Sequence, residues 1–170
     1  MNIRDASLAD AENIARIHVD SWQSAYRGQI PDIILDNLDS AKRAVFWQTH
    51  LADARFRTFV AEMNGQVIGF CDLIPSRDAD SNPQITAEIA AIYIHPNHWR
   101  RGAGRALCLR AFATARNTGF KIITLWALKS NTAAQQFYRA LGFQPDGATK
   151  SELLNDHVLH EMRFRILPLI

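Results

Sequence analysis

A glycine-containing turn between a long apolar run and an amphipathic segment constrains the fold of this chain more than any other feature. The apolar run at residues 85–94 (ITAEIAAIYI) is typical of a strand, and segment 102–118 places its apolar residues on one helical face. Residues 121–128 (KIITLWAL) hardly alternate in polarity and indicate a second, buried strand. A strand, a helix and a strand in this order predict a parallel crossover, with the turn at the helix N-terminus.

The remaining segments add hairpins and helices around this unit. Asn64-Gly65 is a strong hairpin signal between two strand-like runs. In chain order, we expect a strand at 1–5, helices beginning near Ser7, Pro31 and Ser40, strands at 56–62 and 66–71, a helix at 131–141, and strands at 147–154 and 157–165. The fold class is therefore α/β, more narrowly an α+β mixed sheet that is mostly antiparallel, contains the parallel crossover and is flanked by helices.

Length and composition exclude several classes of protein. The 170 residues are most simply one domain, 1–170, and 48% hydrophobic residues are enough for a buried core. A net charge of +2, from 19 basic and 17 acidic residues, does not favour nucleic acid or a membrane surface as partner. The first residues lack the apolar core of a signal peptide, and no run approaches the ~20 apolar residues of a membrane span. We expect a cytoplasmic protein.

The chain offers no convincing metal or disulfide site. Cys71 and Cys108 both lie in apolar surroundings, where reduced cysteines commonly serve as packing residues. His157 and His160 are three residues apart on an expected strand, so their side chains point to opposite faces. No metal cofactor is expected.

Gly102 and Gly104 precede the central helix, although glycine lowers helix stability. A helix N-terminus exposes unpaired N–H groups, and a glycine-rich turn lets an anion approach them. The pattern lacks the lysine of a P-loop and the third glycine of the dinucleotide motif, which would stand at Leu107. From the glycines alone, a tight turn and a phosphate cradle both remain open.

Two separated segments carry a family resemblance. Residues 92–107 (IYIHPNHWRRGAGRAL) and residues 131–143 (NTAAQQFYRALGF) resemble the GNAT superfamily of N-acetyltransferases. The first is similar to that family's acetyl-CoA pyrophosphate loop, [Gln/Arg]-x-x-Gly-x-[Gly/Ala], and the second to its N-x-x-A-x-x-F-Y-x-x-x-G-F segment. The order of elements matches over nearly the whole chain. Trp99 departs from the pattern, because it stands where Gln or Arg is expected.

The resemblance implies acetyl-CoA as cofactor and assigns it two groups of residues. Backbone groups of Ile92, Tyr93 and Ile94 would bind the pantetheine arm and polarise the thioester carbonyl, while their side chains pack in the core. Because the pyrophosphate loop uses mainly backbone N–H groups, the Trp99 departure affects a side-chain contact and leaves the cradle intact. The residues implied for the pyrophosphate are Trp99, Arg100, Arg101, Gly102, Ala103, Gly104 and Arg105.

Tyr138 and Glu88 are the candidate catalytic residues. Tyr138 matches the family tyrosine that gives a proton to the leaving sulfur, and its alternative is a core aromatic. Asn131 matches an asparagine that contacts pantetheine, and it also suits a helix N-cap. Glu88 could act as general base through water, sharing a strand face with Ile92 and Ile94, or could be a solvated strand end.

The acceptor side is expected at the first helices, where Trp22, Tyr26 and Arg27 could line a pocket or simply pack. We expect an N-acetyltransferase that acetylates the primary amine of a small molecule by direct attack, since no serine or cysteine nucleophile motif is present. Two alternatives stay open: an enzyme that acetylates protein N-termini or lysines, and a CoA-binding sensor without turnover. A homodimer is left open as the assembly.

Overall fold

The computed structural model describes residues 1–166. In these residues the strands form one sheet of order β1-β2-β3-β4-β5-β7-β6, in which only β4 and β5 run parallel. The predicted mixed and mostly antiparallel sheet is thereby confirmed. The strands are β1 (Asn2–Asp5), β2 (Arg57–Met63), β3 (Gln66–Pro75), β4 (Thr86–Ile94), β5 (Ile122–Leu128), β6 (Gln144–Leu154) and β7 (His157–Ile166). The helices are η1 (Leu8–Asp10), α1 (Ala11–Ala25), α2 (Asp32–Asp36), α3 (Ser40–Leu51), η2 (Pro96–His98), α4 (Ala103–Asn117) and α5 (Thr132–Ala140).

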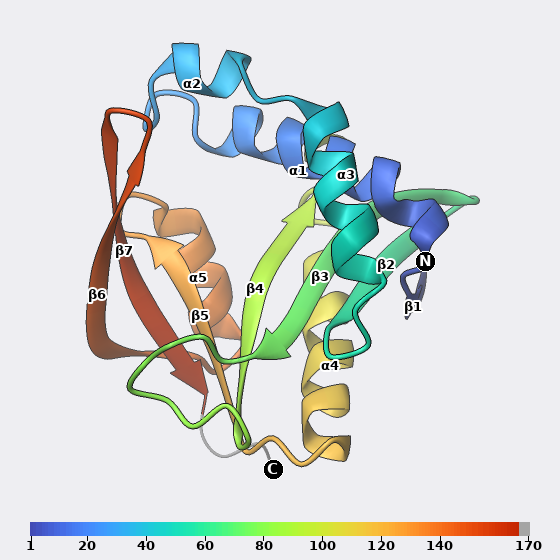
Figure 1. The fold of residues 1–170 in the computed structure, drawn as a ribbon, viewed down its shortest axis with the longest axis vertical. Coiled ribbons are helices and arrows are strands. Elements are labelled where there is room, and N and C mark those ends of the chain that lie inside the picture. The colour runs from blue at the N-terminus through green and yellow to red at the C-terminus, as the bar shows by residue number, and fades with distance from the viewer. Residues whose placement is uncertain (167–170) are drawn as a thin grey trace.

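Helices cover both faces of the sheet. Figure 1 shows α4 and α5 behind the sheet, and α1 with α3 across its upper end. The larger core forms against α4, where Leu107, Cys108 and Ala111 are completely buried. A second core joins α1 and α3 to the opposite face around Trp47 and Phe70. The apolar stripe predicted for the central helix is therefore its buried face.

The parallel pair at the centre of the sheet is short. β4 and β5 pair only where residues 86–88 face residues 122–124. Beyond this point the strands separate, and Figure 1 shows the β4 arrowhead pointing toward α1 while the β5 arrowhead points away from it. The second half of β4 consequently has a free backbone edge in the middle of the sheet. We call the opening between this second half of β4 (residues 89–94) and β5 the gap. The gap lies directly before the turn that leads into α4.

A β-bulge changes which face of β4 each side chain occupies. Asp72 of β3 lies opposite Ala91, whereas the next residue, Leu73, lies opposite Ile89, so one residue of β4 is extra. Before the bulge, Ala87 and Ile89 face the α4 core, and Glu88 therefore faces the other side. After it, Ile92 and Ile94 face the α4 core. The prediction that Glu88 shares a face with these isoleucines is wrong, because the bulge inverts the alternation.

β3 continues beyond the expected end at Cys71, through Asp72 to Pro75. An aspartate normally disfavours a strand interior. Here the buried Asp72 carboxylate has two partners, since the Thr58 hydroxyl donates to Oδ1 at 2.8 Å and His50 Nε2 lies 2.9 Å from Oδ2. These partners offset the cost of burying the carboxylate, and they tie α3 to β2 and β3.

Candidate functional site

The free edge of β4 presents backbone groups of Ile92 and Ile94. In an antiparallel pair, alternate residues direct their backbone groups toward the partner strand. The N–H of His95 donates to Ile68 of β3 at 2.8 Å, so the peptide groups of Tyr93, two residues earlier, also face β3. Those of Ile92 and Ile94 point into the gap. Of the three residues predicted to bind pantetheine, Tyr93 thus offers its side chain and not its backbone.

The carbonyl of Ile94 already has two donors. The Ser21 hydroxyl donates to it at 2.9 Å and the Trp99 indole N–H at 2.6 Å. Both lone pairs are therefore occupied. The backbone groups of the gap without such partners are the N–H and C=O of Ile92 and the N–H of Ile94. The Trp99 indole binds the last carbonyl of β4, so this departure from the family pattern has a structural role. Sequence analysis missed Ser21, the other donor to that carbonyl.

The turn before α4 has the backbone of an anion cradle. Gly102 is the N-cap at φ +86° and offers no side-chain cap, while Arg100 also has a positive φ of 58°. The bond from Ala106 N–H to the Gly102 carbonyl, 3.0 Å long, closes the first turn, so the amides before it lie free. A Cβ at Gly102 would meet no atom within 4 Å. The predicted Arg100, Arg101 and Arg105 are all exposed around this turn.

The two glycines of the turn serve different purposes. A Cβ at Gly104 would lie 3.2 Å from Cζ of Phe137 and 3.8 Å from Cγ1 of Ile94. Gly104 therefore allows α4 to approach α5 closely. In this structure Gly102 supplies the positive φ and Gly104 supplies close helix packing, and the role of both glycines in a phosphate cradle stays a prediction.

Three tyrosines from different elements converge beside the gap. Tyr138 of α5 is buried, its ring centroid 6.1 Å from that of Phe143. Burial raises the pKa of the Tyr138 hydroxyl, and the nearby Tyr26 and Tyr93 hydroxyls raise it further. Burial also raises the pKa of Tyr26 and of Tyr93. All three phenols therefore stay protonated at neutral pH and can donate hydrogen bonds.

Asn131 is the N-cap of α5, as predicted, and its contact with pantetheine stays a prediction. Its side chain accepts from the Ala134 N–H at 3.1 Å and so caps α5. The same side chain interacts with the Tyr26 hydroxyl and lowers its pKa against the effect of burial. Asn131 thereby connects the start of α5 to the phenols at the gap.

One face of α1 forms an aromatic wall with β4. Trp22 and Tyr26 meet edge to face at a centroid distance of 5.1 Å, and His18 stacks on Tyr93 at 4.6 Å. Burial, followed by the charge of Arg43, lowers the pKa of His18 to about 3, so its ring is neutral at physiological pH. Sequence analysis missed His18, although His18, Trp22 and Tyr26 recur every four residues, the spacing of one helix face.

Arg27 does not join this wall. Its guanidinium lies 3.0 Å from Asp32 and 2.9 Å from Asp36, both on α2. These exposed ion pairs fasten the end of α1 to α2. In this structure Arg27 has a structural contact, and its predicted contact with substrate stays untested.

Glu88 is buried and bound by an arginine. The Arg77 guanidinium contacts both carboxylate oxygens, at 2.5 Å from Nη2 to Oε1 and 3.2 Å from Nε to Oε2. The Arg77 N–H adds a third contact at 3.3 Å. Glu88 is thus no solvated strand end. Arg77 is mostly exposed, so the pair can open toward solvent.

A second carboxylate reaches the aromatic wall from β7. Glu161 lies opposite Leu128 of β5, a residue that packs in one cluster with Tyr26. The charge of Glu161 raises the pKa of both Tyr26 and Tyr93. Its buried Oε2 lies 3.2 Å from Nζ of Lys150. Sequence analysis missed Glu161, and nothing in the linear pattern of the last strand singled it out.

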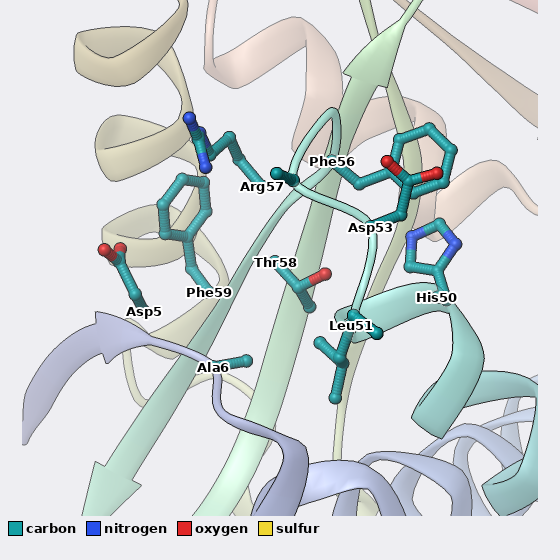
Figure 2. A pocket seen from close by; sticks show the side chains of 11 residues that line it. Asp5, Ala6, His50, Leu51, Asp53, Phe56, Arg57, Thr58 and Phe59 are labelled. Carbon is teal, nitrogen blue, oxygen red and sulfur yellow. The ribbon is translucent and has the colours of Figure 1, made fainter.

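A cavity of about 240 Å³ lies elsewhere, at the C-terminal end of α3. Figure 2 shows His50 and Phe56 on one side of it and Asp5 with Phe59 on the other. None of the predicted site residues lines it. The His50 ring, stacked on Phe56 at 4.3 Å, is engaged by Asp72. We attribute this region to the anchoring of α3.

Within residues 1–166, no group of His, Cys, Asp and Glu side chains is arranged to hold a metal ion. In the same part of the chain, no helix combines the length and apolar character needed to cross a membrane.

Comparison with known proteins identifies the family. A model described as the Acetyltransferase (GNAT) family matches residues 13–143. The chain belongs to the GNAT family of acetyltransferases. The family and the transferase class that the sequence motifs implied are thereby confirmed.

The GNAT relatives include enzymes and solved structures that cover most of this chain. The N-acetyltransferase YuaI of Bacillus subtilis strain 168, named as uncharacterized, is 31% identical over 82% of this chain and 78% of its own length. The L-amino acid N-acyltransferase MnaT of Escherichia coli K12 is 28% identical over 84% of this chain and 79% of its own. The PaiA N-acetyltransferase of Thermoplasma acidophilum, solved with coenzyme A, is 20% identical and superposes with a TM-score of 0.73 over 95% of this chain and 96% of its own.

Proposed function

We propose that this GNAT protein transfers an acetyl group from acetyl-CoA to the primary amine of a small molecule. The observation that carries the proposal is the meeting, at one gap, of a free β4 edge, an uncapped α4 N-terminus and a protonated tyrosine. These features supply an extended backbone partner, an anion site and a proton donor. A CoA thioester needs all three.

The residues around the gap fit acetyl-CoA. The turn at Gly102 would hold the pyrophosphate through the free amides of α4, with Arg100, Arg101 and Arg105 available to the phosphates. The open backbone groups of Ile92 and Ile94 would hold the pantetheine arm like an added strand. When bound, acetyl-CoA supplies an acetyl group already activated as a thioester.

Tyr138 is the proton donor of the proposed reaction. Its hydroxyl stays protonated, because burial raises its pKa above the ordinary value of 10.0. A developing thiolate in the same buried surroundings lacks solvent and gains from a directed O–H donor. The acceptor nitrogen attacks the thioester carbonyl directly, and the carbon–sulfur bond breaks as the sulfur takes up the proton.

The attacking amine must lose a proton before or during the reaction, since a lysine-like amine has a pKa near 10.4. Two carboxylates are candidates for that proton. Glu88 keeps its predicted role as base, and the Arg77 guanidinium contacts its carboxylate. Glu161 is the alternative, because its charge acts on the Tyr93 hydroxyl. Glutamine variants at the two positions separate these candidates.

The aromatic wall supports a small acceptor. Trp22, Tyr26, Tyr93 and His18 form a continuous group of rings beside the gap. Such a surface suits a compact molecule with an apolar body. The activity named for MnaT, acylation of L-amino acids, is consistent with it. Acetylation of a protein N-terminus or lysine remains the alternative function.

Release of CoA from acetyl-CoA, followed with a thiol reagent across a panel of free amines and short peptides, tests the proposal. We expect turnover with free amines, and loss of roughly 10²-fold or more in kcat for Tyr138→Phe, with CoA affinity within a few-fold. Phenylalanine keeps the buried ring, so melting temperature should stay close to wild type. Turnover with peptides alone would favour the protein-directed alternative. An unchanged kcat in Tyr138→Phe would mean that this tyrosine is a core aromatic and not the proton donor.

A further inference from the structure

Among the residues that the structure describes, 1–166, Arg43 is a partly buried cation without an acidic partner. Within residues 1–166, four arginines are not exposed, and two of them form ion pairs with carboxylates. Arg4 binds Asp10, Arg163 binds three aspartates, and Arg165 lies in the field of Asp80. Arg43 forms no ion pair in this part of the chain, and burial lowers the pKa of its guanidinium. Partly buried charges are normally paired, so Arg43 is suited to bind an anion from outside the chain.

The position of Arg43 places that anion at the acceptor wall. Its Nη1 lies 3.4 Å from Nδ1 of His18, whose neutral ring accepts a hydrogen bond there and stacks on Tyr93. Its charge also lowers the pKa of the Tyr93 hydroxyl against the effect of burial. One nitrogen of the guanidinium contacts His18, and its other N–H groups are left to bind a ligand.

The anion is not a phosphate of CoA. The turn at Gly102 begins α4, which covers the face of the sheet occupied by Ile92 and Ile94. Arg43 belongs to α3, which packs with α1 on the opposite face, together with Ala91 and Tyr93. A molecule that reaches Arg43 therefore enters from the acceptor side.

The opposite charge lies at the other end of the wall. The carboxylate of Glu161 acts on Tyr26 and Tyr93 from β7, whereas Arg43 acts on Tyr93 from α3. The wall thus has a carboxylate at one end, which Lys150 also contacts at 3.2 Å, and a guanidinium at the other. A molecule with an ammonium group and a carboxylate matches both.

We propose that Arg43 binds the carboxylate of the acceptor, and that the acceptor is an amino acid. This inference rests on the proposed function, because it specifies which free amine the site accepts. The planar guanidinium holds a carboxylate through paired hydrogen bonds, which fixes the orientation of the acceptor along the aromatic wall. The amine end then points toward Glu161 and the gap.

Matched sets of acceptors test the inference. Each set contains an α-amino acid, its carboxamide and its decarboxylated amine, for example L-phenylalanine, L-phenylalaninamide and 2-phenylethylamine. We expect wild-type kcat/KM, calculated for the neutral amine, to be at least about 10-fold higher for the amino acid. Arg43→Gln should raise KM for the amino acid by about 10- to 100-fold and change KM for the other two by less than about 2-fold.

Two variants and a second measurement control the test. Lys42→Gln removes a cation from the neighbouring, exposed position of α3 and should leave all three acceptors unchanged. Arg43→Lys keeps the positive charge but lacks the planar guanidinium with its paired donors, so it should show an intermediate KM for the amino acid. The amino acid, added with CoA, should raise the melting temperature of wild type and Lys42→Gln but not of Arg43→Gln.

The outcomes distinguish the inference from the proposed function. Equal wild-type kcat/KM within each set would overturn the inference while the acetyltransferase function stood. Equal losses for all three acceptors in Arg43→Gln would do the same, because Arg43 would then act on the fold. Absence of turnover with every free amine would overturn the proposed function, and the inference with it.

Discussion

Gly102 is the position where the anion cradle can be tested most directly. Its φ of +86° is a conformation that valine strongly disfavours and asparagine tolerates. Since a Cβ there meets no atom within 4 Å, any loss of stability comes from the backbone and not from a clash. We expect Gly102→Val to lower the free energy of unfolding by about 1–3 kcal/mol, and Gly102→Asn by less than about 1 kcal/mol.

The same backbone argument predicts the effect on the cofactor. Valine would shift the turn toward negative φ and misdirect the amides of the first turn of α4. Loss of one hydrogen bond to a charged phosphate is worth about 1.5–3 kcal/mol, or roughly a 10- to 100-fold weaker Kd for CoA. Gly102→Asn should keep Kd within a few-fold, since it keeps the positive φ. Calorimetric titration with CoA and urea unfolding measure the two quantities.

Gly119 provides the matched control. It follows the other end of α4 with a φ of +92°, and a Cβ at this position would also meet no atom within 4 Å. Gly119→Val should therefore cost a similar amount of stability and leave the Kd for CoA unchanged. If Gly102→Val lost stability as expected but bound CoA like wild type, the cradle would be refuted.

Two further predictions concern titratable groups. Glu88→Gln should lower kcat for the amine by more than about 10-fold, whereas Glu161→Gln, which removes the carboxylate facing the acceptor ammonium, should raise KM and leave kcat nearly unchanged; a loss of kcat in Glu161→Gln alone would make Glu161 the base. His18 has a folded pKa of about 3, below the ordinary 6.5, so the unfolded chain binds more protons between these values and stability falls as pH falls below 6.5. Urea unfolding should show a loss of up to about 2 kcal/mol from this group between pH 6.5 and 5, and His18→Phe should remove it; an equal loss in both proteins would contradict the buried, neutral ring.

Much of the fold could be predicted because it depends on local periodicity. The crossover of β4, α4 and β5 follows from apolar patterns and a glycine turn, and the observed bounds differ from the expected ones by a residue or so. Asn131 and Tyr138 were found because they belong to a contiguous motif on α5. The bulge in β4 could not be predicted, since a single extra residue depends on the pairing of Asp72 and Leu73 with the neighbouring strand.

The candidate site also combines features that the sequence determined with features that only the tertiary structure decided. The sequence by itself determined the turn at Gly102, the family and the transferase class, because each depends on residues that are adjacent in the chain or repeat along one element. Only the tertiary structure decided that Trp99 and Ser21 bind the Ile94 carbonyl, that Arg77 binds Glu88 and that, among residues 1–166, Arg43 lacks an acid. Those facts depend on contacts between elements far apart in sequence. Burial and charge pairing there are set by what the fold brings together, and linear spacing does not encode them.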